Sequence, residues 1–128
     1  MELQIPVAPG ELIDKLTILE IKLARITDPD KLANVRREYT LLTAVWKNAG
    51  QETEEVTGLR SELLAVNHRL WDIEDAIRDC ERNKEYGERF VELARSVYVQ
   101  NDKRAEIKKR INLELGSSIV EEKSYAEY

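Results

Sequence analysis

The sequence predicts an all-α fold, an antiparallel helical bundle of two hairpins with an extended N-terminal arm and a C-terminal tail. Through most of the chain, apolar residues recur at steps of three and four, the spacing of one helix face. Charged residues occupy 35% of the 128 positions, while glycine and proline are scarce, a composition typical of long helices with charged surfaces. Strand-like alternation is confined to the first few positions. The length fits a single helical domain over residues 1–128.

The first nine residues, MELQIPVAP, predict an extended arm. Its two prolines and the alternating Leu3, Ile5 and Val7 are unfavourable to a helix. An arm of this kind lies across a helix of its own chain or exchanges with a neighbouring chain, and the sequence leaves both arrangements open.

The short hairpin is predicted over about residues 10–49. Its first helix carries a row of leucines on one face and Ile18 and Ile21 on the opposite face. A helix that is apolar on two faces is either central in its bundle or in contact with another chain. We therefore treat Ile18 and Ile21 as candidate interface residues.

Local signals separate the two helices of the short hairpin. Asp28 is a favourable N-cap and Pro29 fits the first helical position, so a second helix begins here. Gly50 is expected to end it in a left-handed conformation.

The long hairpin is predicted over about residues 52–115. The first of its two helices carries an apolar seam at heptad spacing, which is typical of a coiled coil. The seam consists of Val56, Leu59, Leu63, Val66, Leu70, Ile73, Ile77 and Cys80.

A second, half-polar stripe runs beside this seam, and the partner helix is interrupted by polar residues at the same height. Closing the hairpin near Tyr86 brings Asn67 level with Arg104 and Trp71 level with Asn101, because residues equally far from the turn face each other. We expect a polar layer built from Asn67, Trp71, Glu74, Arg78, Tyr98, Asn101 and Arg104.

The polar layer has two interpretations. In the first, the layer is a hydrogen-bond network that sets helix register, as single polar core residues do in coiled coils. Alternatively, it is a small pocket in which Arg104 and the asparagine amides recognise an anion or a carboxylate.

Composition excludes several kinds of site. A formal charge of −5 opposes binding to nucleic acid or to an anionic membrane, since both need a basic surface. One histidine and one cysteine are too few for an ordinary zinc site, and no glycine-rich phosphate loop is present, so no cofactor or metal is expected. No signal peptide or membrane-spanning stretch is visible, which predicts a cytoplasmic protein.

One acidic spacing is similar to a known metal motif. Glu52 and Glu55, followed by Asp72 and Asp75, resemble the paired acidic motifs with which all-helical nucleotide pyrophosphohydrolases hold magnesium. The resemblance covers eight positions, and Asp72 stands where that family has Glu.

A broader resemblance covers nearly the whole chain. The blocks GELIDKLTILEIKLARI, KLANVRREY, VNHRLWDIEDAIR, FVELARSVYVQNDKRAEIKKRIN and GSSIVEEKSY resemble, in order, those of a bacterial domain family of unknown function. The resemblance implies a small bacterial intracellular protein and supplies no catalytic residues.

The function expected from the sequence is therefore interaction rather than catalysis. The leading hypothesis is a non-enzymatic helical module that self-associates as a homo-oligomer or binds a protein partner. The alternative is a binder of a small anionic ligand, or an enzyme, that uses the polar layer between the two long helices.

Overall fold

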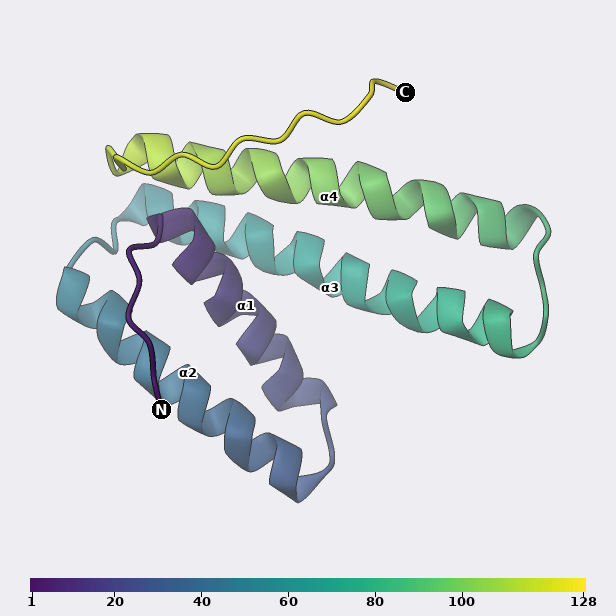
Figure 1. The fold of residues 1–128 in the computed structure, drawn as a ribbon, viewed down its shortest axis with the longest axis horizontal. Helices are drawn as coiled ribbons and strands as arrows, with labels where there is room; N and C mark the ends of the chain where they lie inside the picture. The colour runs from purple at the N-terminus through teal and green to yellow at the C-terminus, as the bar shows by residue number, and fades with distance from the viewer.

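A computed structural model describes residues 1–128 and confirms the all-α fold. The helices are α1 (Pro9–Arg25), α2 (Pro29–Ala49), α3 (Glu54–Arg82) and α4 (Glu88–Glu114). They form a short hairpin, α1–α2, and a long hairpin, α3–α4 (Figure 1). The long hairpin starts and ends slightly inside the limits expected from the sequence. None of the four helices combines the length and apolar character that a membrane span requires.

The connections follow the capping signals of the sequence. The Asp28 carboxylate accepts hydrogen bonds from the backbone N–H groups of Asp30 and Lys31 at 2.9 and 3.4 Å, which caps α2. Gly50 ends α2 with a φ of 62°, in the left-handed region that favours glycine. The Thr53 hydroxyl caps α3 by accepting from the Val56 N–H at 3.2 Å. Each end of the α2–α3 connection is thus set locally.

Helix α1 lies at the centre of the molecule, in contact with α2, α3 and α4. This position accounts for its two apolar faces, because both are covered within the chain. Ile21 is only 1% exposed, and Ile18 is half-buried at the edge of the packed region. The prediction that these two isoleucines form an interface loses its main argument and stays a prediction.

The hydrophobic core occupies one half of the long hairpin. Helix α1 packs against the N-terminal half of α3 and the C-terminal half of α4, and α2 packs on α1 (Figure 1). The core consists of Leu12, Ile13, Leu16, Trp46, Val56, Leu59, Leu63, Val66, Ile107 and Ile111.

The other half of the long hairpin, toward the α3–α4 turn, has no third helix packed along it, although the C-terminal end of α1 still reaches Asp72 through Arg25 (Figure 1). In α3, Cys80 is the only fully buried residue that follows Asn67. In α4, no residue that precedes Ile107 is fully buried. We call the apolar residues of α3 and α4 in this half, with the exposed Ala94 among them, the distal hairpin surface. Its members are Ile73, Ile77, Phe90, Leu93, Ala94 and Val97, all half-buried except Ala94.

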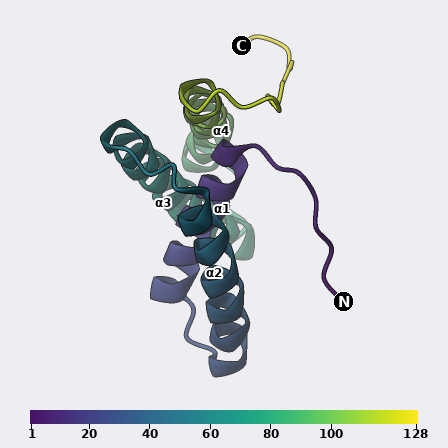
Figure 2. The same cartoon turned by 90° about the vertical axis from the view of Figure 1, so that its left-hand side faces the viewer.

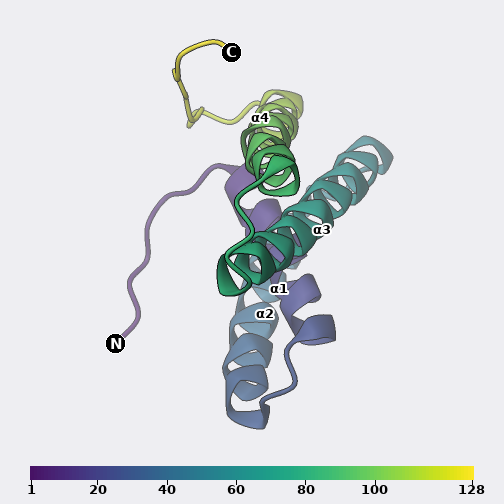
Figure 3. The same ribbon diagram turned by 90° about the vertical axis from the view of Figure 1, so that its right-hand side faces the viewer.

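The two ends of the chain differ in how they lie relative to the helices. The arm, residues 1–8, is extended and leaves the body on the side opposite to α3 (Figures 2 and 3). The tail, residues 117–128, runs back along α4 (Figure 1). An ion pair of 2.6 Å between Lys123 and Asp102 holds it, and the Tyr128 and Tyr98 rings lie 4.7 Å apart between centroids.

Candidate functional site

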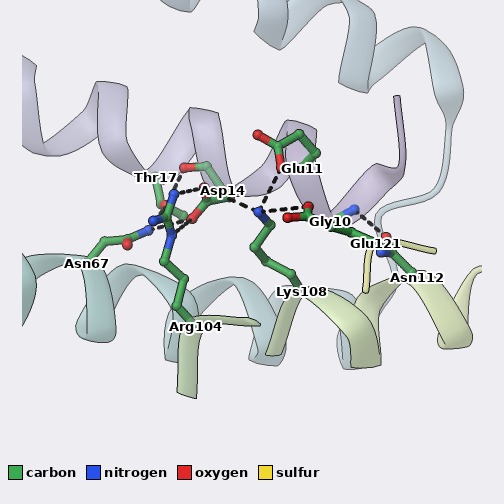
Figure 4. Close-up of polar contacts among 9 residues, drawn as sticks. All are labelled: Gly10, Glu11, Asp14, Thr17, Asn67, Arg104, Lys108, Asn112 and Glu121. Atoms are coloured by element: carbon green, nitrogen blue, oxygen red, sulfur yellow. Dashed lines mark hydrogen bonds and ion pairs between the residues drawn. The ribbon is translucent and has the colours of Figure 1, made fainter. Parts of the chain in front are cut away.

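Part of the predicted polar layer converges on one buried carboxylate, that of Asp14 on α1 (Figure 4). Asp14 is 1% exposed. Arg104 of α4 donates from Nε to Oδ1 at 2.9 Å and from Nη2 to Oδ2 at 2.5 Å. Asn67 of α3 donates from Nδ2 to Oδ1 at 2.9 Å. A single carboxylate therefore ties together three helices from both hairpins.

Helix α1 presents this carboxylate on a narrow face of small and polar residues. Gly10, Asp14, Thr17 and Ile21 follow one another at helical spacing and all are buried. The Thr17 hydroxyl donates to the Asp14 carbonyl at 2.7 Å and accepts from Asn67 Nδ2 at 2.9 Å. The Thr17 hydroxyl and the Asn67 amide therefore both have hydrogen-bond partners inside the packed region.

The charges at this point compensate one another. Hydrogen bonding to Asp14 raises the pKa of the Arg104 guanidinium above its ordinary value, and it outweighs burial, which acts in the opposite direction. Lys108 adds a second cation, with Nζ 4.0 Å from Asp14 Oδ2 and 2.7 Å from Glu11 Oε2. The cluster is thus a set of matched ion pairs.

A close backbone contact brings α1 against α4 one turn before Asp14. The Gly10 N–H donates to Asn112 Oδ1 at 2.7 Å (Figure 4). A Cβ on Gly10 would lie 2.5 Å from the Lys108 carbonyl oxygen and 2.8 Å from that same Asn112 oxygen. Only glycine fits at this contact, so its missing side chain sets how near Asp14 comes to α4.

Five of the seven predicted layer residues line one groove between α1, α3 and Arg104 of α4. Glu74 and Arg78 form an exposed ion pair of 3.1 Å on its rim, and Trp71 is half-buried in its wall. We call this hollow, about 290 Å³ in volume, the α1–α3 groove. Its lining consists of Ile18, Ile21, Asn67, Leu70, Trp71, Glu74, Asp75, Arg78 and Arg104.

Tyr98 and Asn101, the other two predicted residues, stand apart from this groove. Tyr98 packs against the ring of Tyr128 in the tail. Asn101 lines a separate hollow of about 320 Å³ between α4 and the tail, which Arg104 and Lys123 also border. Both cations are engaged, Arg104 by Asp14 and Lys123 by Asp102.

The acidic pairs that resemble a magnesium motif do not converge. Asp72 forms an ion pair of 2.7 Å with Arg25, and Glu52 lies 3.5 Å from Arg60. Glu55 lies beside Glu114, and this neighbouring carboxylate raises the pKa of the Glu114 carboxyl. No group of three or more acidic, histidine or cysteine side chains is placed to hold one metal ion.

Asp14 is the residue that the sequence reasoning missed as the centre of the layer. The sequence does contain a signal for it, because Asp14 shares one helical face with Gly10, Thr17 and Ile21. An acidic residue on a buried face needs a cation or amide groups opposite it. Arg104 was identified as a polar break in an apolar stripe, and Asn67 as part of the half-polar stripe at the same height.

Comparison with known proteins places the chain in a family. Residues 1–128 match a family of unknown function, DUF6165, and the protein belongs to it. No curated protein and no solved structure matches the chain. The match bears out the resemblance to a domain family of unknown function.

Proposed function

We propose that the protein is a non-enzymatic helical interaction module that self-associates through the distal hairpin surface. The observation that carries this proposal is the uneven burial of the apolar seam. The seam is fully covered from Val56 to Val66, where α1 packs on it, whereas Ile77 of α3 and Leu93 of α4 are only half-buried.

A second copy is the partner that this surface fits. Two antiparallel helices with one apolar side are half of a four-helix bundle, and a second identical hairpin supplies the other half. A two-fold contact of this kind is self-complementary, because the same residues meet on both sides.

The charges bordering the surface support an apolar contact. Glu74 pairs with Arg78, Arg82 with Asp79 and Arg89 with Glu85, each within one helix or its flanking turn. These residues are solvated and already matched, so two copies meet without bringing unpaired charges together.

An anion site at Arg104, the alternative that the sequence offers, has less support. The guanidinium makes two hydrogen bonds to Asp14, and an incoming anion has to compete with a carboxylate that is already buried. The arrangement of Asp14, Asn67 and Thr17 favours the network that sets register.

The test is the mass of the protein in solution, measured by light scattering over a concentration series. We expect the wild type to have twice the mass of one chain. Ala94→Glu places a charge on the distal hairpin surface at an exposed position and should weaken dimerisation at least about tenfold. Ala44→Glu, the same change at an exposed position on α2, should leave it unchanged. A wild-type protein that stays monomeric at high concentration overturns the proposal.

A further inference from the structure

We infer that the N-terminal arm of one copy binds in the α1–α3 groove of a second copy. This inference rests on the proposed self-association and names a second contact within it. It starts from two features that lack a partner within the chain, the arm and the groove.

The arm is an amphipathic extended segment. Leu3 and Ile5 are 81% and 73% exposed, and with Val7 they alternate with Glu2 and Gln4. In an extended chain, alternate side chains point to opposite sides, so the apolar residues share one side. A row of largely exposed apolar side chains is typical of a segment that binds another surface.

The arm is also stiff, which favours docking. Pro6 and Pro9 hold the residues before them in extended conformations, and Ala8 has φ −70° and ψ 146°. Its root is anchored, because Ala8 is buried and Gly10 is hydrogen-bonded to Asn112. A segment that is extended before binding loses little conformational freedom when it docks.

The groove matches the arm in chemistry. Ile18, Leu70 and Trp71 provide apolar side chains for Leu3 and Ile5. Arg78 on the rim is largely exposed and pairs with Glu74 through Nη1 only, so its other nitrogens are open to Glu2, the only acidic or basic side chain of the arm.

The direction of the arm points to a second copy rather than to its own groove. Figures 2 and 3 show the arm leaving the body on the side opposite to α3, whereas most of the groove lining belongs to α3. The arm therefore extends away from the groove of its own chain, which leaves it free to enter the groove of a second copy.

Crosslinking between two single-cysteine variants tests this inference. One chain carries Gln4→Cys and the other Asp75→Cys, an exposed position that lines the groove, and a short bis-maleimide reagent joins thiols that lie close together. The native Cys80 is fully buried, so the introduced thiols are the reactive ones. The matched control replaces Asp75→Cys with Glu38→Cys, another exposed acidic position, on α2.

We expect a crosslinked heterodimer from Gln4→Cys with Asp75→Cys, and at least about tenfold less with Glu38→Cys, because docking raises the effective concentration of one thiol pair. Equal yields from both mixtures overturn the inference. So does crosslinking within one chain only, tested with Gln4→Cys and Asp75→Cys together in that chain.

Light scattering on the wild type separates failure of this inference from failure of the proposed function. A dimer without the arm–groove crosslink overturns arm exchange and leaves the distal hairpin contact standing. A monomer overturns both. A further variant, Leu3→Ser with Ile5→Ser, should weaken the dimer, since neither side chain packs within its own chain. Leu41→Ser, at an exposed position on α2, should have no effect.

Discussion

Arg104 binds the buried carboxylate of Asp14, ninety residues away in the sequence, through two hydrogen bonds of 2.9 and 2.5 Å. The contact joins the first helix of one hairpin to the last helix of the other. Pairs of this kind add little net stability relative to a well-packed apolar contact, but they admit only one arrangement of the helices. We therefore infer that Asp14 and Arg104 set the register in which the two hairpins meet.

Removing the cation should destabilise the protein. Arg104→Met leaves the Asp14 carboxylate buried with Asn67 as its only close amide donor, and we expect a loss of about 3 kcal/mol in the free energy of unfolding. Urea denaturation followed by circular dichroism measures it. Arg110→Met on the same helix removes an exposed pair of 3.7 Å with Glu62 and should cost less than about 1 kcal/mol.

The double variant Asp14→Leu with Arg104→Met tests whether the ion pair stabilises the fold or only sets the register of the two hairpins. Replacing both charges with apolar side chains should recover most of the stability lost in Arg104→Met, because no uncompensated charge remains. If the double variant is instead less stable than Arg104→Met alone, the pair contributes directly to stability and our interpretation of it as a register contact is wrong.

A second carboxylate beside Asp14 should make stability depend on pH. Asn67→Asp removes an amide donor and adds a like charge, so the pKa of the carboxyl pair rises above that of the unfolded chain. A raised folded pKa means that the penalty is full at neutral pH, about 3 kcal/mol, and shrinks as the pH falls and a proton is taken up. Urea denaturation at pH 7 and pH 5 checks it, with Asn34→Asp at an exposed position on α2 as the control.

Two glycine substitutions should act in opposite directions. Gly10→Ala puts a Cβ 2.5 Å from the Lys108 carbonyl oxygen, so α1 has to move away from α4, at an expected cost of about 1–3 kcal/mol. Gly58→Ala, in open space on α3, should stabilise the protein by about 0.5–1 kcal/mol. Thermal unfolding of both variants measures the difference. Equal shifts in Tm would show that the Gly10 contact is not tight in solution.

The sequence was sufficient for the helices because their signals are local. The caps at Asp28 and Gly50 and the seam spacing depend only on neighbouring residues. The height at which Asn67 and Arg104 approach each other also followed from the sequence, since a hairpin brings residues equally far from its turn together. Both side chains reach the same carboxylate in the structure.

What escaped sequence reasoning is how the two hairpins pack together. Ile21 suggested an interface with another chain, and it is covered because α1 lies between α2 and the long hairpin. The same packing brings Asp14 into the polar layer and leaves Tyr98 outside it. Contacts between elements far apart in the sequence depend on crossing geometry, which periodicity within one helix does not specify.

The contact between the tail and α4 should hold only over a limited pH range. The hydrogen bond from Lys123 lowers the pKa of Asp102 below 3.8. The stability that this pair gives to the docked tail is therefore present above pH 3.8 and is lost as the pH falls through the lower folded pKa. Partial desolvation of the hydroxyl, and then the neighbouring Asp102 carboxylate, raise the pKa of Tyr128 above 10.0. The contribution of Tyr128 is present below that value and is lost as the pH rises through the higher folded pKa.

Nuclear magnetic resonance of the contact between the Tyr98 and Tyr128 rings follows the docked tail across this range. We expect the contact to be constant near neutral pH, to disappear in strong acid as Asp102 is protonated, and to disappear in strong base as Tyr128 ionises. Lys123→Gln should weaken it already at neutral pH, whereas Lys31→Gln, on exposed α2, should not. A contact that persists unchanged in Lys123→Gln means that ring packing holds the tail and that the ion pair with Asp102 is dispensable.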